Sequence, residues 1–167
     1  MDLAVVALAS EHQVRKVREL TPVLYEKRYC SKANLELPVY EVYRDCCDNE
    51  ARDLTQKRGL RYDVTVMPPL LLGEEYVKTF GHHHFPCREG VSHPEVFRIV
   101  EGEAQFLIQK QCGEEVIDAS LIVAKEGQEV LIPPDYGHVM INTSSGRLVT
   151  ENLISRGCIR AYEQYMK

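Results

Sequence analysis

Short stretches rich in β-branched and aromatic residues recur along this 167-residue chain, and they limit its fold more than any other feature. Eight of them are expected to be strands: 39–43, 62–67, 95–100, 104–108, 116–123, 130–132, 139–142 and 148–154. Glycines separate these stretches at Gly73, Gly90, Gly102, Gly113, Gly127 and Gly146. Short strands with regular turns favour a mainly β sandwich or barrel over parallel β-α-β units.

Two short peripheral helices are also expected. Ser10 and Gln13 have the spacing of a capping box, and apolar residues follow at helical spacing up to Leu20. A second helix is expected to begin near Asp48 and to end at Gly59, which suits a left-handed cap. The length fits a single domain, divided into an N-terminal strand and helix extension (1–36), a barrel (37–155) and a C-terminal tail (156–167).

Composition narrows the classes of partner. The net charge is −5 and no cluster of Lys and Arg stands clear of acidic neighbours, so no nucleic-acid partner is expected. The apolar run 3–9 follows Asp2 without a basic leader, so it is predicted to be a strand, and no run is long enough to span a membrane. Six cysteines without a CxxC pair are expected to be reduced, which places the protein in the cytoplasm.

Three consecutive histidines form the most informative motif. In an extended strand alternate side chains share a face, so His82 and His84 would point together while His83 points away. Further along, Glu95 begins an apolar strand, where burying an unpaired carboxylate is costly and a metal ion would satisfy it. His138 follows a proline turn and opens a later strand.

These segments resemble the paired motifs of the cupin superfamily. The first motif is HxH, a downstream Glu, six residues and Gly; the second is Gly, five residues, Pro, a turn, His, three residues and Asn. The second motif matches at Gly127, Pro133, His138 and Asn142, with Asp135 where cupins usually carry Gly. Ten residues separate His84 from Glu95 instead of three or four, so the hairpin 85–94 is expected to bulge outward. The resemblance implies a cupin double-stranded β-helix, or jelly-roll barrel.

Around the motifs the sequence is similar to the cupin-type glucose-6-phosphate isomerases known chiefly from archaea. The similarity lies in PVYEVY (38–43), TFGHHH (79–84) and IPPDYGHV (132–139). It implies that one divalent transition metal ion per chain is held by His82, His84, Glu95 and His138. Iron is the expected metal, with manganese, nickel, cobalt or zinc as alternatives.

The same resemblance implies a sugar phosphate as the small-molecule partner. Its phosphate would be bound by Tyr40, Thr65, Thr79 and the Gly81 amide, with Lys78 as an added charge. Three sequence differences concern this pocket: the long hairpin, Phe97 where the family usually carries Tyr, and a tail in which Tyr162 and Tyr165 would replace family Tyr and His residues.

The implied reaction is aldose–ketose isomerisation of glucose 6-phosphate and fructose 6-phosphate. Glu95 is the candidate catalytic base in an enediol route, while a metal-assisted hydride shift would use the same residues. Two alternatives stay open: a non-haem iron cupin dioxygenase, because three His and one Glu also suit oxygen chemistry, and a non-catalytic metal and sugar-phosphate-binding cupin. A homodimer is expected by family analogy, with the run 3–9 as the pairing segment.

Overall fold

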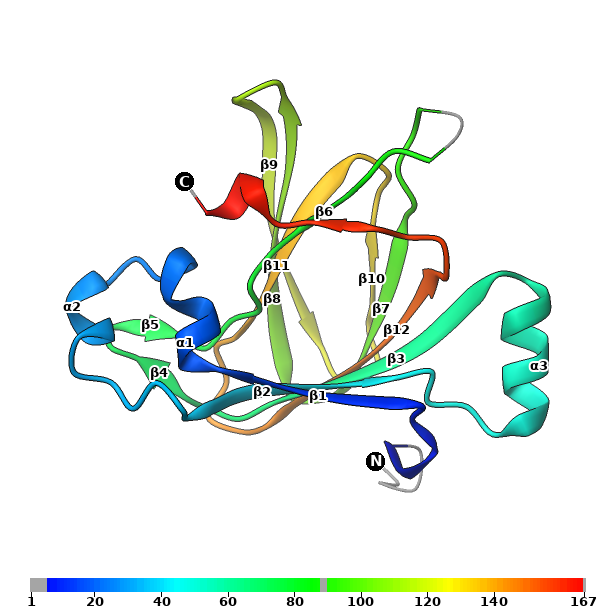
Figure 1. Cartoon of the computed structure of the whole chain (residues 1–167), viewed down its shortest axis with the longest axis horizontal. Coiled ribbons are helices and arrows are strands. Elements are labelled where there is room, and N and C mark those ends of the chain that lie inside the picture. Colours follow the sequence, from blue (N-terminus) through cyan, green and yellow to red (C-terminus); the bar gives the residue numbers. More distant parts are fainter. Residues whose placement is uncertain (1–5, 88–89, 167) are drawn as a thin grey trace.

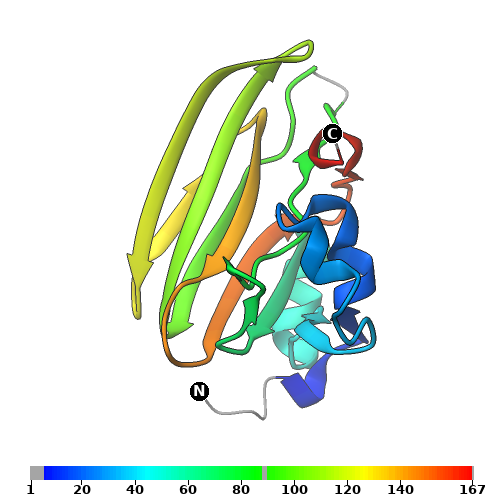
Figure 2. The same ribbon diagram turned by 90° about the vertical axis from the view of Figure 1, so that its left-hand side faces the viewer.

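Two antiparallel sheets form the body of the computed structural model, which describes residues 6–87 and 90–166 (Figures 1 and 2). The larger sheet has the order β1-β2-β3-β12-β7-β10, formed by Glu11–Lys16, Pro38–Arg44, Leu60–Met67, Leu148–Ser155, Glu95–Glu101 and Glu129–Ile132. The smaller sheet has the order β11-β8-β9, formed by Tyr136–Asn142, Glu103–Cys112 and Glu115–Lys125. Two short pairs complete the strands: β4 (Leu71–Leu72) with β5 (Glu75–Tyr76), and β6 (His83–His84) with β13 (Arg160–Ala161).

Each of the eight predicted strands lies within an observed one, so the prediction of a mainly β sandwich or barrel is confirmed. The two layers are visible from the side in Figure 2. Apolar side chains from both sheets fill the space between them, among them Phe106, Ile99 and Met140, which are essentially inaccessible to solvent. Burial of such side chains is the dominant stabilising term of this fold.

The helices are short and lie outside the two sheets (Figure 1). They are α1 (Val17–Leu20), α2 (Lys27–Cys30) and α3 (Asn49–Lys57), with 3-10 turns at Val6–Leu8, Thr21–Val23 and Glu163–Tyr165. The predicted helix between Asp48 and Gly59 is confirmed: the Asp48 carboxylate accepts a hydrogen bond from Ala51 N at 2.8 Å, and Gly59 has φ +65°. None of the helices in the described residues is long and apolar enough to cross a membrane.

The N-terminal predictions were wrong in two places. Residues 11–16 form β1 rather than the start of a helix, because they pair with β2 from Glu11↔Arg44 to Arg15↔Tyr40, and such pairing overrides a weak local helix preference. The helix begins only at Val17, where the Glu19 carboxylate accepts a hydrogen bond from Lys16 N at 2.8 Å. Val6–Leu8 is a 3-10 turn and not a strand, while residues 3–5 of the run 3–9 lie outside the described residues.

The turn after β11 is held by Asn142, the last residue of the second cupin-like motif. Its side-chain amide donates to the carbonyl oxygens of Met67, Pro68 and Gly146 at 3.0–3.2 Å, and its Oδ1 accepts from Ser144 N and Oγ. Asn142 is completely buried. One side chain therefore satisfies backbone groups in two segments, the end of β3 at residues 67–68 and the turn at residues 144–146.

We expect Asn142→Ala to lower the free energy of unfolding by about 2 to 3 kcal/mol, because buried carbonyl groups lose their donors. The measurement is urea-induced unfolding followed by circular dichroism. Gln128→Ala is the matched control, since Gln128 is exposed and accepts one hydrogen bond from Lys125 N; it should cost less than about 1 kcal/mol. Equal losses in the two variants would contradict the structural role given to Asn142.

Candidate metal centre

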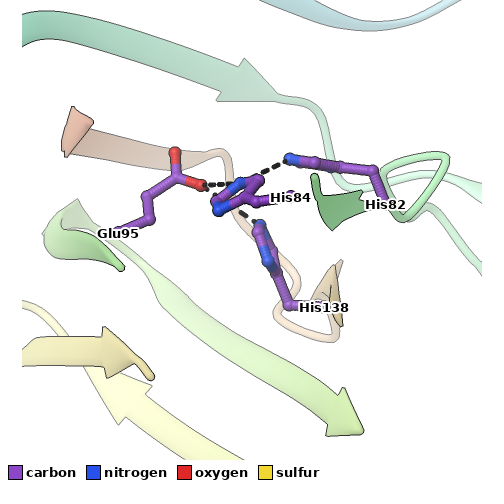
Figure 3. Close-up of side chains that lie close together, drawn as sticks. All are labelled: His82, His84, Glu95 and His138. Atoms are coloured by element: carbon purple, nitrogen blue, oxygen red, sulfur yellow. Dashed lines mark hydrogen bonds and ion pairs between the residues drawn. The ribbon is translucent and has the colours of Figure 1, made fainter. Parts of the chain in front are cut away.

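Four potential metal ligands converge inside the barrel: His82, His84, Glu95 and His138 (Figure 3). One ligand atom from each lies within 4.8 Å of the others. The His82 and His84 Nε2 atoms are 3.2 Å apart, and Glu95 Oε2 lies 3.2 Å from His84 Nε2 and 3.6 Å from His138 Nε2. The predicted HxH pair does share a face, and β7 and β11 bring the other two side chains to it.

The donor set fits a transition metal ion. Glu95 is 2% exposed, yet its Oε2 accepts no well-formed hydrogen bond from any described residue. Such a buried oxygen is costly unless a cation satisfies it. Three imidazole nitrogens and one carboxylate oxygen are ligands that iron, manganese, nickel, cobalt and zinc accept, and they leave coordination positions open for another molecule.

Neighbouring groups hold two of these ligands in position. The Asn152 side-chain amide donates to Glu95 Oε1 at 2.7 Å, which leaves Oε2 to face the imidazoles. His84 Nδ1 lies 2.7 Å from the His93 carbonyl oxygen, so Nδ1 carries a hydrogen and Nε2 is directed into the cluster. Partners of this kind orient ligands and raise metal affinity in known sites.

Burial, hydrogen bonds and neighbouring charges shift the pKa values of the four clustered side chains. Burial lowers the pKa of His138 to about 4 and, with the nearby His138 and Arg160 charges, holds the pKa of His82 well below its usual value. Burial also opposes charge on His84, but hydrogen bonds with Cys158 and Glu95 and the Glu95 charge raise the pKa of His84 to about 10. Burial would raise the pKa of Glu95, yet hydrogen bonding to His84 and the charges of His138 and Arg160 lower it overall. A divalent cation would take the place of the proton on His84.

A pocket opens beside the cluster, and the predicted phosphate-binding residues Tyr40, Thr65, Thr79 and Gly81 all line it. The Thr79 hydroxyl oxygen accepts from Met140 N at 3.0 Å, so its hydrogen can be donated elsewhere. Gly81 has φ +83°, and a Cβ there would lie 2.6 Å from Val139 Cγ2, so both the backbone conformation and the packing require glycine.

The predicted added charge, Lys78, does not line the pocket, whereas another cationic residue does. Lys78 forms an ion pair with Glu75 at 2.6 Å and is not part of the pocket lining. Arg15 does line the pocket, and β1 pairs it directly with Tyr40. Its Nη1 donates to Glu19 Oε1 at 2.7 Å, which leaves its other guanidinium donors for a ligand. The sequence missed Arg15 because the segment 11–16 was predicted as a helix, which hid the alternation that places Arg15 on the face of β1 next to Tyr40.

The two tail tyrosines have different positions. Tyr162 lines the pocket, with its ring 5.7 Å from that of His82. Tyr165 packs instead beside His83, with a ring separation of 5.4 Å, and behind Gly81. Phe97 lines the pocket and its ring lies 5.5 Å from that of His138, so this wall presents no hydroxyl where the family usually has one.

The long hairpin is tied to the turn before β11. Ser92 N donates to the Asp135 carboxylate at 2.9 Å, and Asp135 N donates to Ser92 Oγ at 2.6 Å. Asp135 has φ +67°, the left-handed conformation that explains why Asp can replace the usual Gly. The hairpin therefore positions the strand that carries His138 as well as the His93 carbonyl that contacts His84.

Four further polar residues line the pocket that sequence reasoning did not select: Arg44, Asp63, Asn152 and Arg160. Arg44, Asp63 and Asn152 lie in longer strands among other polar residues, and Arg160 lies in the two-residue strand β13, so no sequence pattern distinguished them. Only the strand register brings them together, and the pairing of β13 with β6 places Arg160 beside the histidines.

Comparison with known proteins identifies the family of the chain. A family model described as glucose-6-phosphate isomerase matches residues 14–167. The glucose-6-phosphate isomerase of Thermococcus gammatolerans is 29% identical over 131 residues, covering 78% of this chain and 62% of that protein. Its counterpart from Thermococcus litoralis is 33% identical over 106 residues, covering 63% and 48%. The chain thus spans about half to three fifths of the length of these relatives.

Solved structures support the fold. An oxalate oxidase in complex with the substrate analogue glycolate superposes with a TM-score of 0.55 at 14% identity, over 74% of this chain and 54% of that one. Oxalate decarboxylase from Bacillus subtilis gives a TM-score of 0.54 at 15% identity, over 80% and 30%. At such identities the likeness shows the fold alone, which is a cupin β-barrel.

We expect His138→Ala to lose most bound metal, to below about one tenth of the wild-type content, because removal of a ligand also leaves Glu95 unbalanced. The measurement is elemental analysis of protein purified with iron or manganese in the buffer. His12→Ala is the control, since His12 is exposed and pairs with Glu41 on the surface. A stoichiometric metal content in His138→Ala would remove this residue from the ligand set.

Proposed function

The chain belongs to the glucose-6-phosphate isomerase family, and from this membership and its pocket we propose that it interconverts glucose 6-phosphate and fructose 6-phosphate as a metal-dependent aldose–ketose isomerase. The observation that carries the proposal is a buried cluster of three histidines and one glutamate beside a pocket lined by hydroxyl and guanidinium groups. The cluster suits two adjacent sugar oxygens, and the hydroxyl and guanidinium groups suit a phosphate.

His82, His84, Glu95 and His138 would hold one divalent transition ion, which we propose to be iron, with manganese, nickel, cobalt or zinc able to replace it. When bound, the ion supplies Lewis-acid polarisation of the sugar oxygens at C1 and C2. Asn152 keeps the second oxygen of Glu95 fixed, so the carboxylate cannot turn away from the sugar.

Tyr40, Thr65, Thr79 and the Gly81 amide are proposed to bind the phosphate, with Arg15 as the counter-charge. The Tyr40 hydroxyl accepts a hydrogen bond from Phe80 N at 3.4 Å and is free to donate its own hydrogen. The absence of a side chain at Gly81 lets an anion approach the backbone closely. Hydrogen bonds to a phosphate are stronger than those between neutral groups, so a few donors are sufficient to hold it.

Isomerisation moves one hydrogen from C2 to C1 and one hydroxyl proton from O2 to O1, so nothing is gained or lost overall. In the enediol route Glu95 removes the proton from C2 and returns it to C1, a role that requires the carboxylate to be ionised. The lowered pKa of Glu95 supports this requirement. In a hydride shift the hydrogen passes directly between the two carbons, and Glu95 serves only as a ligand.

We also propose that the protein is a cytoplasmic homodimer. All six cysteines are free, which fits a reducing compartment. Exposed apolar side chains follow one another along β9, where Ile117, Leu121 and Val123 are at least half exposed. Contiguous apolar surface of this kind is commonly covered by another subunit.

The test is a coupled assay with the metal-loaded protein and glucose 6-phosphate, run with and without oxygen. We expect the same turnover in both conditions, because isomerisation consumes no oxidant. Turnover that stops without oxygen would identify a dioxygenase. Binding of glucose 6-phosphate without any formation of fructose 6-phosphate would identify a non-catalytic sugar-phosphate-binding protein.

We expect Thr79→Val to raise KM for glucose 6-phosphate about tenfold or more while metal content stays near the wild-type value, since one hydrogen bond to a charged group is lost. Thr79→Ser is the matched control, because it retains the hydroxyl that also accepts from Met140 N. Steady-state kinetics and elemental analysis on the same samples make the comparison. If Thr79→Val loses metal but keeps its KM, the residue does not contact the phosphate.

A further inference from the structure

Three arginines surround one carboxylate at the side of the pocket next to the metal cluster. Arg61 contacts both oxygens of Asp63, from Nε at 2.8 Å to Oδ1 and from Nη2 at 2.8 Å to Oδ2. Arg44 Nη1 donates to Asp63 Oδ2 at 3.0 Å. Arg160 Nη2 lies 3.9 Å from the same oxygen, beyond hydrogen-bonding distance.

This group has an excess of positive charge. The three guanidinium groups carry one charge each, since arginine stays protonated, while Asp63 supplies one negative charge and the exposed Glu11, 3.9 Å from Arg44 Nε, supplies a second. Asp63 is 1% exposed and the arginine side chains are 14 to 21% exposed, so water screens the excess poorly. Among the described residues, Asp63 is the only carboxylate that forms an ion pair with Arg160.

Two of the three arginines face the pocket. Arg44 and Arg160 line it, whereas Arg61 does not. Along β2 the side chains of Tyr40, Val42 and Arg44 turn to the same face, so Arg44 lies about 13 Å along the strand from Tyr40. The pocket therefore has cationic or donor groups at both ends: Arg15 and Tyr40 at one, Arg44 and Arg160 at the other.

Arg160 is also in contact with the metal cluster. Its Nε donates to His82 Nε2 at 3.2 Å, the same nitrogen that converges on Glu95 and the other imidazoles. A metal ion at the cluster would take the lone pair that this hydrogen bond uses. Arg160 would then need another acceptor, and the ion would raise the local positive potential further.

We propose that Arg160 and Arg44 form a second anion subsite, so that the pocket favours a phosphorylated sugar with a carboxylate at the end remote from its phosphate. The inference rests on the phosphate-binding role proposed for Tyr40 and Thr79. The phosphate occupies the end with Arg15, and the carboxylate of a sugar acid phosphate lies at the end with Arg160 and Arg44. Such a guanidinium pair suits a carboxylate because its donors match the two oxygens.

The test compares two acyclic probes of equal length by isothermal titration calorimetry. 6-Phosphogluconate has a carboxylate at C1, and sorbitol 6-phosphate has an uncharged hydroxymethyl group there. We expect the metal-loaded wild-type protein to bind 6-phosphogluconate at least about tenfold more tightly than sorbitol 6-phosphate, the usual size of one charge-assisted interaction. The metal content of every sample is measured, so that equally loaded proteins are compared.

A carboxylate could also bind to the metal, so variants of the two arginines are needed to distinguish metal binding from arginine binding. Arg160→Gln and Arg44→Gln should each reduce the ratio of the two affinities about tenfold while sorbitol 6-phosphate binds nearly as before. Arg160→Lys should retain part of the preference, since it keeps the charge. Arg98→Gln is the matched control, an exposed arginine on β7 outside the pocket, and should change neither affinity.

The outcomes separate this inference from the proposed function. If both probes bind but neither arginine variant changes the ratio, the second subsite is overturned and the phosphate site stands. If Thr79→Val weakens both probes equally and leaves the ratio unchanged, the two ends act separately as proposed. If neither probe binds to the wild-type protein, the phosphate site and the second subsite both fail.

Discussion

The architecture around the site depends on one constraint, the burial of the Glu95 carboxylate. A carboxylate that is 2% exposed must be paired, and here its partners come from segments far apart in the sequence. Asn152 on β12 holds one oxygen, while His84 beside β13 and His138 on β11 face the other. Glu95 therefore gains all of these partners only when both sheets and the C-terminal segment have folded. A site of this kind belongs to the fold as a whole, and separate pieces of the chain could not form it.

Much of the fold was readable from local patterns. Stretches of β-branched and aromatic residues between turns predicted eight of the nine strands in the two main sheets. The alternation of side chains along an extended strand predicted that His82 and His84 would share a face and that His83 would not. The strand prediction failed at residues 11–16, where a capping-box spacing suggested a helix. These residues form a strand because they pair with β2, which lies elsewhere in the sequence. The local spacing of Ser10 and Gln13 cannot reveal such a partner.

The charged residues at the side of the pocket next to the metal cluster could not be predicted from local patterns. Arg44, Asp63 and Arg160 lie on three different strands, and they meet only because of the register of β2, β3 and β13. In the sequence they resemble ordinary charged strand residues, and only the strand register shows that they lie close together. The predicted Lys78 shows the converse, since its side chain pairs with Glu75 and does not line the pocket. Ligand spacing within a motif is thus predictable, whereas electrostatic surroundings built by distant strands require the structure.

The C-terminal segment connects the metal centre to the choice of ligand. β13 pairs Arg160 with His84 and Ala161 with His83, so the tail is attached to the short strand that carries His84, directly after His82 (Figure 1). From that position Arg160 reaches His82, and the Tyr162 ring contacts those of Phe80 and His82. The proposed metal ligands come from the barrel, whereas the tail contributes the neighbouring side chains Arg160 and Cys158, which hydrogen-bond to His82 and His84. Substitutions in the tail would therefore change the surroundings of the four proposed ligands without removing any of them, and the residues that surround a site are what adapt one fold to different chemistries.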